Sequence, residues 1–185
     1  MKKTSLMTSI VVLLILAAGI VYLTTQLAGS KSSSTAPGAF NGKNSTFIMN
    51  GTPVTLENGL SQKPAAPGSK TTVTVRYFGN EAVGDLNGDG LPDTAYLVTQ
   101  NSGGSATFYY AVVALKNETG FTTTNAFFIG DRIAPQSTEI HADSKELRVN
   151  FADRKPGEAF TTPPSVGATV VLKVTPAGVL KGLMK

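Results

Sequence analysis

The sequence predicts an all-β domain, an antiparallel β-sandwich or open barrel of roughly eight to ten short strands, preceded by one N-terminal transmembrane helix. Three observations lead to this prediction. Short runs of alternating apolar and polar residues recur after residue 45, and Gly, Pro and Asn residues separate them. No helical periodicity follows residue 30. Near the N-terminus, an apolar stretch of about 18 residues approaches the length of a membrane span.

The composition excludes several classes of chemistry. The chain has no cysteine, so disulfides, thiolate metal sites and thiol catalysis are excluded. Its single histidine, His141, excludes zinc sites that need several histidines from one chain. Of the 16 basic residues, three flank the apolar stretch, which leaves 13 against 12 acidic residues elsewhere. No stripe of Lys and Arg is interleaved with aromatic residues, so we expect no nucleic-acid partner.

Residues 1–29 have the features of an export signal. Lys2 and Lys3 precede an apolar run from Leu6 to Leu23, and a spanning helix needs about 20 mostly apolar residues. The exit offers only a partial cleavage site, so we predict an uncleaved signal anchor, with a cleaved signal peptide as the alternative. The lysines stay in the cytoplasm. This predicts a single-pass protein of the cell membrane with its C-terminal domain outside the cytoplasm, or a secreted or periplasmic protein after cleavage.

Four segments follow the export signal. Residues 30–45 are rich in Ser, Gly and Ala, which predicts a flexible tether. Residues 46–62 are expected to form a β-hairpin, because Asn50-Gly51 tolerates the positive φ angles of a type I′ turn. An isolated hairpin is marginal in water, so we expect this one to dock. Residues 63–70 contain two prolines and are predicted to be a linker, and residues 71–185 form the main β-domain.

Within the main domain, strands are expected wherever a β-rich run lies between turn residues. The run 107–115 is long and apolar enough to be a central strand. The expected strands are 72–78, 93–99, 107–115, 121–129, 139–142, 147–151 and 168–175, followed by a short terminal strand.

The most specific signal lies between the first two of these strands. The pattern D-x-N-x-D-G-x-x-D supplies side-chain oxygens from Asp85, Asn87, Asp89 and Asp93, and a main-chain carbonyl from Leu91. A hard cation such as Ca²⁺ takes six to eight oxygen ligands. The three carboxylates repel one another unless they share a cation. A metal-free turn closed by Asx hydrogen bonds is the alternative. The sequence therefore predicts a structural Ca²⁺ site.

This loop resembles two kinds of known calcium loop. It resembles the first half of an EF-hand loop, but Tyr96 stands where the bidentate Glu is needed. The closer resemblance is to the strand-loop-strand calcium loops of integrin-type FG-GAP and VCBS repeats, which also end in Asp and follow a Phe-Gly pair, here Phe78-Gly79. The resemblance implies calcium binding, whereas a single copy does not imply the propeller of those repeats.

A wider stretch, roughly 77–153, resembles a group of secreted or membrane-anchored bacterial proteins of unknown function. The shared elements are V-G-D-L-N-G-D-G-L-P-D, then G-G-S-A-T-F-Y-Y, then F-I-G-D-R-I. This resemblance implies a family and no particular activity.

A second candidate site consists of two Asp-Arg pairs. Asp131-Arg132 and Asp153-Arg154 each follow a strand rich in Phe. Exposed loops often carry binding residues, which makes the pairs a candidate patch for a partner or ligand. The alternative is structural, with Asp capping a turn and Arg pairing with a nearby carboxylate.

The sequence contains no recognisable catalytic constellation, so we predict a binding or structural module of the cell envelope and not an enzyme. The expected partners are the membrane, through the N-terminal helix, and an envelope protein or glycan. Two other functions stay open. The chain could be an envelope glycan hydrolase that works through scattered Asp and Glu residues, or an inhibitor or accessory factor of a wall-active enzyme.

Overall fold

The computed structural model of the protein describes residues 38–183. The predicted signal anchor and residues 30–37 of the predicted tether lie outside the described residues. The described part of the chain is all-β, and its sheets are antiparallel. A single turn of 3₁₀-helix, Gly42–Asn44, precedes the strands. Between residues 38 and 183, no helix has the length and apolar character that crossing a membrane requires.

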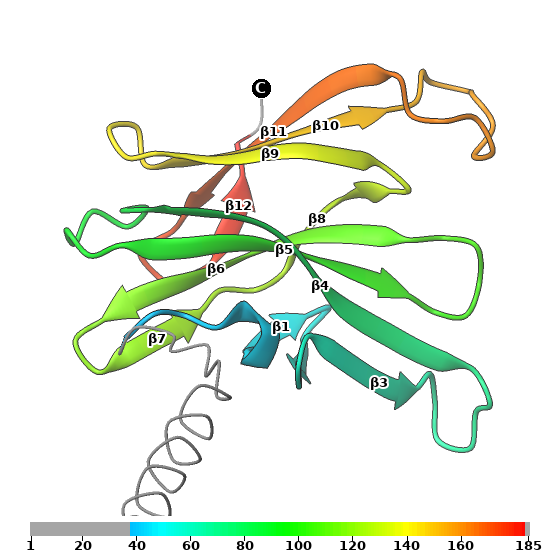
Figure 1. Ribbon diagram of the computed structural model, residues 1–185, viewed down its shortest axis with the longest axis horizontal. Coiled ribbons are helices and arrows are strands. Elements are labelled where there is room, and N and C mark those ends of the chain that lie inside the picture. The colour runs from blue at the N-terminus through cyan, green and yellow to red at the C-terminus, as the bar shows by residue number, and fades with distance from the viewer. Residues whose placement is uncertain (1–37, 184–185) are drawn as a thin grey trace, which may run out of the picture. The chain divides into compact units, whose positions relative to one another are not determined.

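The strands form three sheets (Figure 1). Two strands make a separate hairpin, six make a large sheet in the order β3-β4-β5-β6-β7 with β8 also paired to β6, and four make a small sheet in the order β12-β11-β10-β9. The hairpin contains β1 (Thr46–Met49) and β2 (Thr52–Thr55); the large sheet contains β3 (Leu60–Pro64), β4 (Thr72–Gly84), β5 (Asp93–Asn101), β6 (Phe108–Asn117), β7 (Gly120–Thr123) and β8 (Phe127–Asp131); the small sheet contains β9 (Ala134–His141), β10 (Glu146–Asp153), β11 (Val166–Val174) and β12 (Leu180–Gly182).

One face of the large sheet packs on the small sheet and forms the first core. Side chains alternate along a strand, so Ala95 and Leu97 of β5 face the small sheet while Tyr96 and Val98 face the opposite way. The two sheets come especially close where β4 ends, because a Cβ added to Gly84 would lie 2.7 Å from Cγ2 of Ile140. The buried residues of this core are Leu86, Ala95, Leu97, Ala111, Val113, Leu147, Val149, Leu172 and Leu180.

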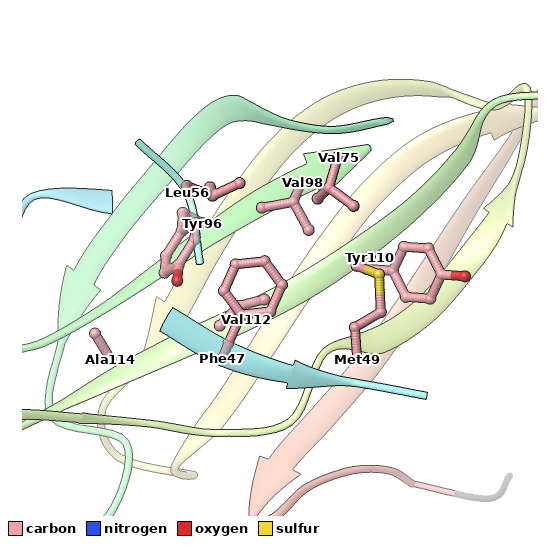
Figure 2. Close-up of a cluster of buried hydrophobic side chains, with 9 residues drawn as sticks. All are labelled: Phe47, Met49, Leu56, Val75, Tyr96, Val98, Tyr110, Val112 and Ala114. Atoms are coloured by element: carbon pink, nitrogen blue, oxygen red, sulfur yellow. The ribbon is translucent and has the colours of Figure 1, made fainter. Parts of the chain in front are cut away.

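The hairpin covers the other face of the large sheet and forms the second core. Phe47 and Met49 of β1 point into this core (Figure 2). Two hydrogen bonds hold β1 in place: Thr123 Oγ1 donates to the Thr46 carbonyl at 2.6 Å, and the Ala126 amide donates to the Ile48 carbonyl at 2.7 Å. The hairpin therefore docks on the main domain. The buried residues of the second core are Phe47, Met49, Leu56, Val75, Tyr96, Val98, Tyr110, Val112 and Ala114.

Two segment boundaries differ from those that the sequence suggests. Residues 40–45, assigned above to the tether, pack on the β-domain, because the Phe40 ring lies 5.4 Å from Tyr96 and 5.1 Å from Phe121 between centroids. Residues 63–70, assigned above to a linker, form the end of β3 and the turn into β4. Pro64 is tolerated in β3 because β3 is an edge strand, where a missing N–H breaks no ladder bond.

Candidate functional site

The residues 85–93 connect β4 to β5 and form a loop that its own acidic side chains close. Gly88 and Gly90 adopt left-handed φ angles of 89° and 81°, which suit glycine. Asp85 Oδ1 accepts the Gly88 amide at 2.6 Å, and Asp85 Oδ2 accepts the Gly90 amide at 3.2 Å. Asn87 Oδ1 accepts the Asp89 amide at 3.0 Å, and Asp89 Oδ1 accepts the Leu91 amide at 2.8 Å. The first three oxygen-bearing side chains thus hold the turn in shape.

The fourth oxygen-bearing side chain, Asp93, is fully buried at the start of β5. Its Oδ2 accepts the Leu86 amide at 2.9 Å, and its Oδ1 accepts the Lys116 amide of β6 at 2.9 Å. Burial raises the pKa of the Asp93 carboxyl, and these two N–H donors act in the opposite direction. Asp93 therefore ties the loop to the neighbouring strand of the large sheet.

The loop also receives a charge from the opposite sheet. Lys145, in the turn between β9 and β10, places Nζ 2.8 Å from Asp85 Oδ2. The hydrogen bond from Lys145 is the main cause that lowers the pKa of Asp85. Sequence reasoning missed this contact, because the two residues are 60 positions apart and no local pattern marks a lysine as the partner of a given loop.

The loop supplies oxygen donors of the type that a hard cation prefers. Asn87 and Asp89 are exposed, and a carboxylate oxygen that accepts one hydrogen bond keeps a free lone pair. Within residues 38–183, however, no group of three or more His, Cys, Asp or Glu side chains is arranged to hold a metal ion. Asn87 Nδ2 donates to Asp89 Oδ2 at 2.8 Å, so both side chains would have to turn from each other toward a cation.

Tyr96 explains why the loop differs from an EF-hand. At the position where an EF-hand carries its bidentate Glu, this tyrosine points away from the loop into the second core (Figure 2). Its hydroxyl lies 3.0 Å from Ser45 Oγ, and burial raises its pKa to about 12. The side chain is therefore part of the packing under the hairpin and not of the loop.

A hollow lies beside the loop. Its volume is about 410 Å³, and it separates the tip of the loop from the turn between β11 and β12. The lining residues are Asn87, Gly88, Asp89, Leu115, Val174, Thr175, Pro176 and Gly178. The tip of the loop is thus open to solvent on this side.

The two Asp-Arg pairs come together in the structure, although they lie on different strands. Arg154 Nη1 donates to the Arg132 carbonyl at 2.9 Å, and Arg132 Nη2 lies 2.6 Å from Asp131 Oδ2. Phe160 lies under Arg132, with 3.9 Å between the guanidinium carbon and the ring centroid. Asp153 Oδ1 accepts the Arg154 amide at 2.7 Å. These contacts join the segment that follows β8 to the segment between β10 and β11. Phe160 lies in the second segment, and the sequence pattern did not identify it.

The outer face of the small sheet carries two carboxylates with lowered pKa values, Glu139 and Glu146. Arg148 donates to Glu146 at 2.9 Å, and this bond is the main cause that lowers the pKa of Glu146. A hydrogen bond from Ser137 is the main cause that lowers the pKa of Glu139. Both carboxylates therefore take part in polar contacts on the surface of the small sheet.

Comparisons of the chain with protein-family models, with curated proteins and with solved structures found no match.

Proposed function

We propose that this chain is an exported binding or structural module of the cell envelope and that its 85–93 loop holds one structural Ca²⁺. The observation that carries the calcium proposal is the arrangement of the loop. Oxygen-bearing side chains at alternate positions close a turn with two left-handed glycines, and Asn87 and Asp89 at its tip are exposed. The ligands would be the side chains of Asp85, Asn87, Asp89 and Asp93 and the carbonyl of Leu91.

The chemistry of these donors favours calcium over other cations. All five are oxygens, which suits a hard cation and not a soft one. Magnesium demands a near-ideal octahedron, whereas an irregular loop on the end of a sheet suits the looser geometry of calcium. Outside the cytoplasm a dissociation constant of about 10⁻⁴ to 10⁻³ M is sufficient. When bound, the ion would offset two of the three negative charges of Asp85, Asp89 and Asp93.

The position of the loop favours a structural role for the ion. The loop connects two neighbouring strands of the large sheet, and Asp93 bonds it to β6. It lies at the end of the sandwich where the β9–β10 and β11–β12 turns also lie (Figure 1). Calcium here would order the loop between β4 and β5. The resemblance to FG-GAP and VCBS calcium loops supports the same proposal at the level of the motif.

The export part of the proposal rests on the sequence. Lys2 and Lys3 followed by the apolar run to Leu23 favour an anchor in the cell membrane, with the β-domain outside the cytoplasm. An all-β sandwich on such an anchor suits contact with an envelope protein or glycan.

Calorimetric titration of the purified full-length chain with CaCl₂ tests the calcium proposal. We expect one site with a dissociation constant of about 10⁻⁴ to 10⁻³ M, and weaker binding of Mg²⁺. Asp89→Ala should abolish binding, because it removes one of the proposed ligands. The variant should still fold, because Asp89 is exposed and its side chain makes no bond outside the loop among the described residues. Asp143→Ala, on the neighbouring β9–β10 turn, is the matched control and should bind normally. Absence of binding by the unaltered chain at millimolar Ca²⁺ would exclude the site.

A further inference from the structure

Lys145 holds a fixed positive charge against the first ligand of the proposed calcium loop. Its Nζ lies 2.8 Å from Asp85 Oδ2. We propose that Lys145 is a built-in competitor of calcium: the ammonium and the metal share Asp85, and calcium binding releases the β9–β10 turn from the loop. The proposal rests on the calcium site proposed above, and the experiment below separates the two.

The position of Lys145 comes from the backbone of its turn. Lys145 is the last residue before β10, and it adopts a left-handed φ of 53°, which is uncommon for a residue other than glycine. Its side chain runs across from the small sheet to the loop of the large sheet. There its Cε would lie 3.7 Å from a Cβ added to Gly88. A side chain held over Gly88 and bonded to Asp85 reaches two positions of the loop at once.

The charges around Asp85 favour competition over cooperation. Asp85 is the only carboxylate within ion-pair distance of Lys145 among the described residues. Each oxygen of Asp85 already accepts a loop amide, and Oδ2 accepts Lys145 as well. A divalent cation bound to the same carboxylate would meet an ammonium directly beside it. Like charges at such short range repel even in a medium close to water, and we expect this repulsion to weaken calcium binding about tenfold.

The competition connects the loop to an exposed surface. The Lys145–Asp85 pair joins two sheets through residues 60 positions apart. Residues 142–144 of the turn are exposed. Without calcium, the ion pair would hold this turn against the loop, whereas with calcium the pair would break and the turn would move more freely. A ligand shifts such an equilibrium only by its difference in affinity for the two states, and the shared carboxylate provides that difference.

The test compares two substitutions at the same position in the full-length chain. Lys145→Met keeps most of the length of the side chain and removes its charge, and Lys145→Arg keeps the charge. Both variants should fold, because a partly exposed ion pair at the surface contributes little to stability. In calorimetric titrations we expect Lys145→Met to bind Ca²⁺ about tenfold more tightly than the unaltered chain, and Lys145→Arg to bind nearly as the unaltered chain does. Lys173→Met removes a positive charge from the same sheet, where Lys173 lies 3.9 Å from Glu146 and pairs with no carboxylate of the loop, and should leave the affinity unchanged.

Hydrogen exchange gives a second readout. Calcium should speed exchange in residues 142–146 of the unaltered chain, and in Lys145→Met this segment should exchange rapidly with or without calcium. If the unaltered chain binds calcium and Lys145→Met binds no more tightly, the competition is excluded and the calcium site stands. If only Lys145→Met binds calcium, the competition holds in its strongest form and calcium occupancy of the native loop is excluded. If neither binds, both proposals are excluded.

Discussion

Asp93 joins three segments of the large sheet through a single carboxylate. Its two oxygens accept the amides of Leu86 and Lys116, and the side chain has no exposure to solvent. Hydrogen bonds to an ionised acceptor are stronger than those between neutral groups. The Asp93 carboxylate therefore contributes to the fold whether or not the loop binds a cation.

Removing this carboxylate should destabilise the domain in the absence of calcium. Asp93→Ala leaves two N–H groups without their acceptor, and we expect the free energy of unfolding to fall by about 2 to 5 kcal/mol. Asp93→Asn keeps one acceptor oxygen and should cost less. Urea denaturation in the presence of a chelator measures both effects. Asp143→Ala serves as an exposed control and should change stability by about 0.5 kcal/mol or less. An equally small effect of Asp93→Ala would contradict this role.

A pH dependence should follow from Glu146 on the outer face of the small sheet. Its pKa is lowered in the folded state, chiefly by the hydrogen bond from Arg148. A carboxyl whose folded pKa is below its unfolded value stabilises the protein above the unfolded pKa, and this stabilisation is lost as the pH falls through the folded pKa. Glu146→Gln should therefore lower stability at neutral pH and flatten the loss of stability in acid.

Chemical denaturation between neutral pH and about pH 3, where free carboxyl groups become protonated, measures how the free energy of unfolding of Glu146→Gln and of the unaltered chain changes with pH. Glu118→Gln, on the exposed turn between β6 and β7, controls for the loss of one carboxylate. Parallel pH profiles of Glu146→Gln and the unaltered chain would contradict the assignment.

The hairpin shows what local sequence can and cannot predict about an element. Asn50 and Gly51 adopt φ angles of 51° and 77°, as a type I′ turn requires, so the Asn-Gly pair predicted this turn correctly. Which face of which sheet the hairpin covers depends on contacts with residues 123–126, and no local pattern encodes them. The sequence did not predict strand β3, because Pro64 is typical of a loop. A proline is compatible with a strand only at the edge of a sheet, and the position of β3 at the edge is known only from the structure.

Two adjacent residues of β1 test the docking of the hairpin. Phe47 is 1% exposed in the second core, and Ile48, next to it, is 44% exposed. Phe47→Ala should lower the free energy of unfolding by about 3 to 5 kcal/mol, because it removes a buried ring and leaves a cavity. Ile48→Ala should cost about 1 kcal/mol or less, close to the values for exposed positions. Similar costs for the two substitutions in urea denaturation would contradict a docked hairpin.

The sequence predicted an all-β fold with antiparallel sheets and the position of the loop, but it did not predict the contacts between sheets. The described residues form twelve strands, more than the eight to ten expected. The spacing from Asp85 to Asp93 marks the loop, and the flanking runs mark its strands. Lys145 approaches Asp85 only because the small sheet packs on the large one. Arg132 and Arg154 likewise meet across two loops, although the repeated Asp-Arg pair gave a hint of their association. Contacts of this kind depend on tertiary packing and leave no periodic signal in the sequence.

By the proposal above, calcium bound to the 85–93 loop stabilises the whole β-domain. Thermal unfolding of the full-length chain, with calcium and with a chelator, measures this stabilisation. Calcium at 10 to 100 times the dissociation constant should stabilise the folded state by about 1.4 to 2.7 kcal/mol, which corresponds to a rise in Tm of about 5 °C. Asp89→Ala should unfold at the same temperature in both conditions. A Tm of the unaltered chain that does not change at 10 to 100 times the dissociation constant, which is up to about 100 mM Ca²⁺, would contradict this proposal.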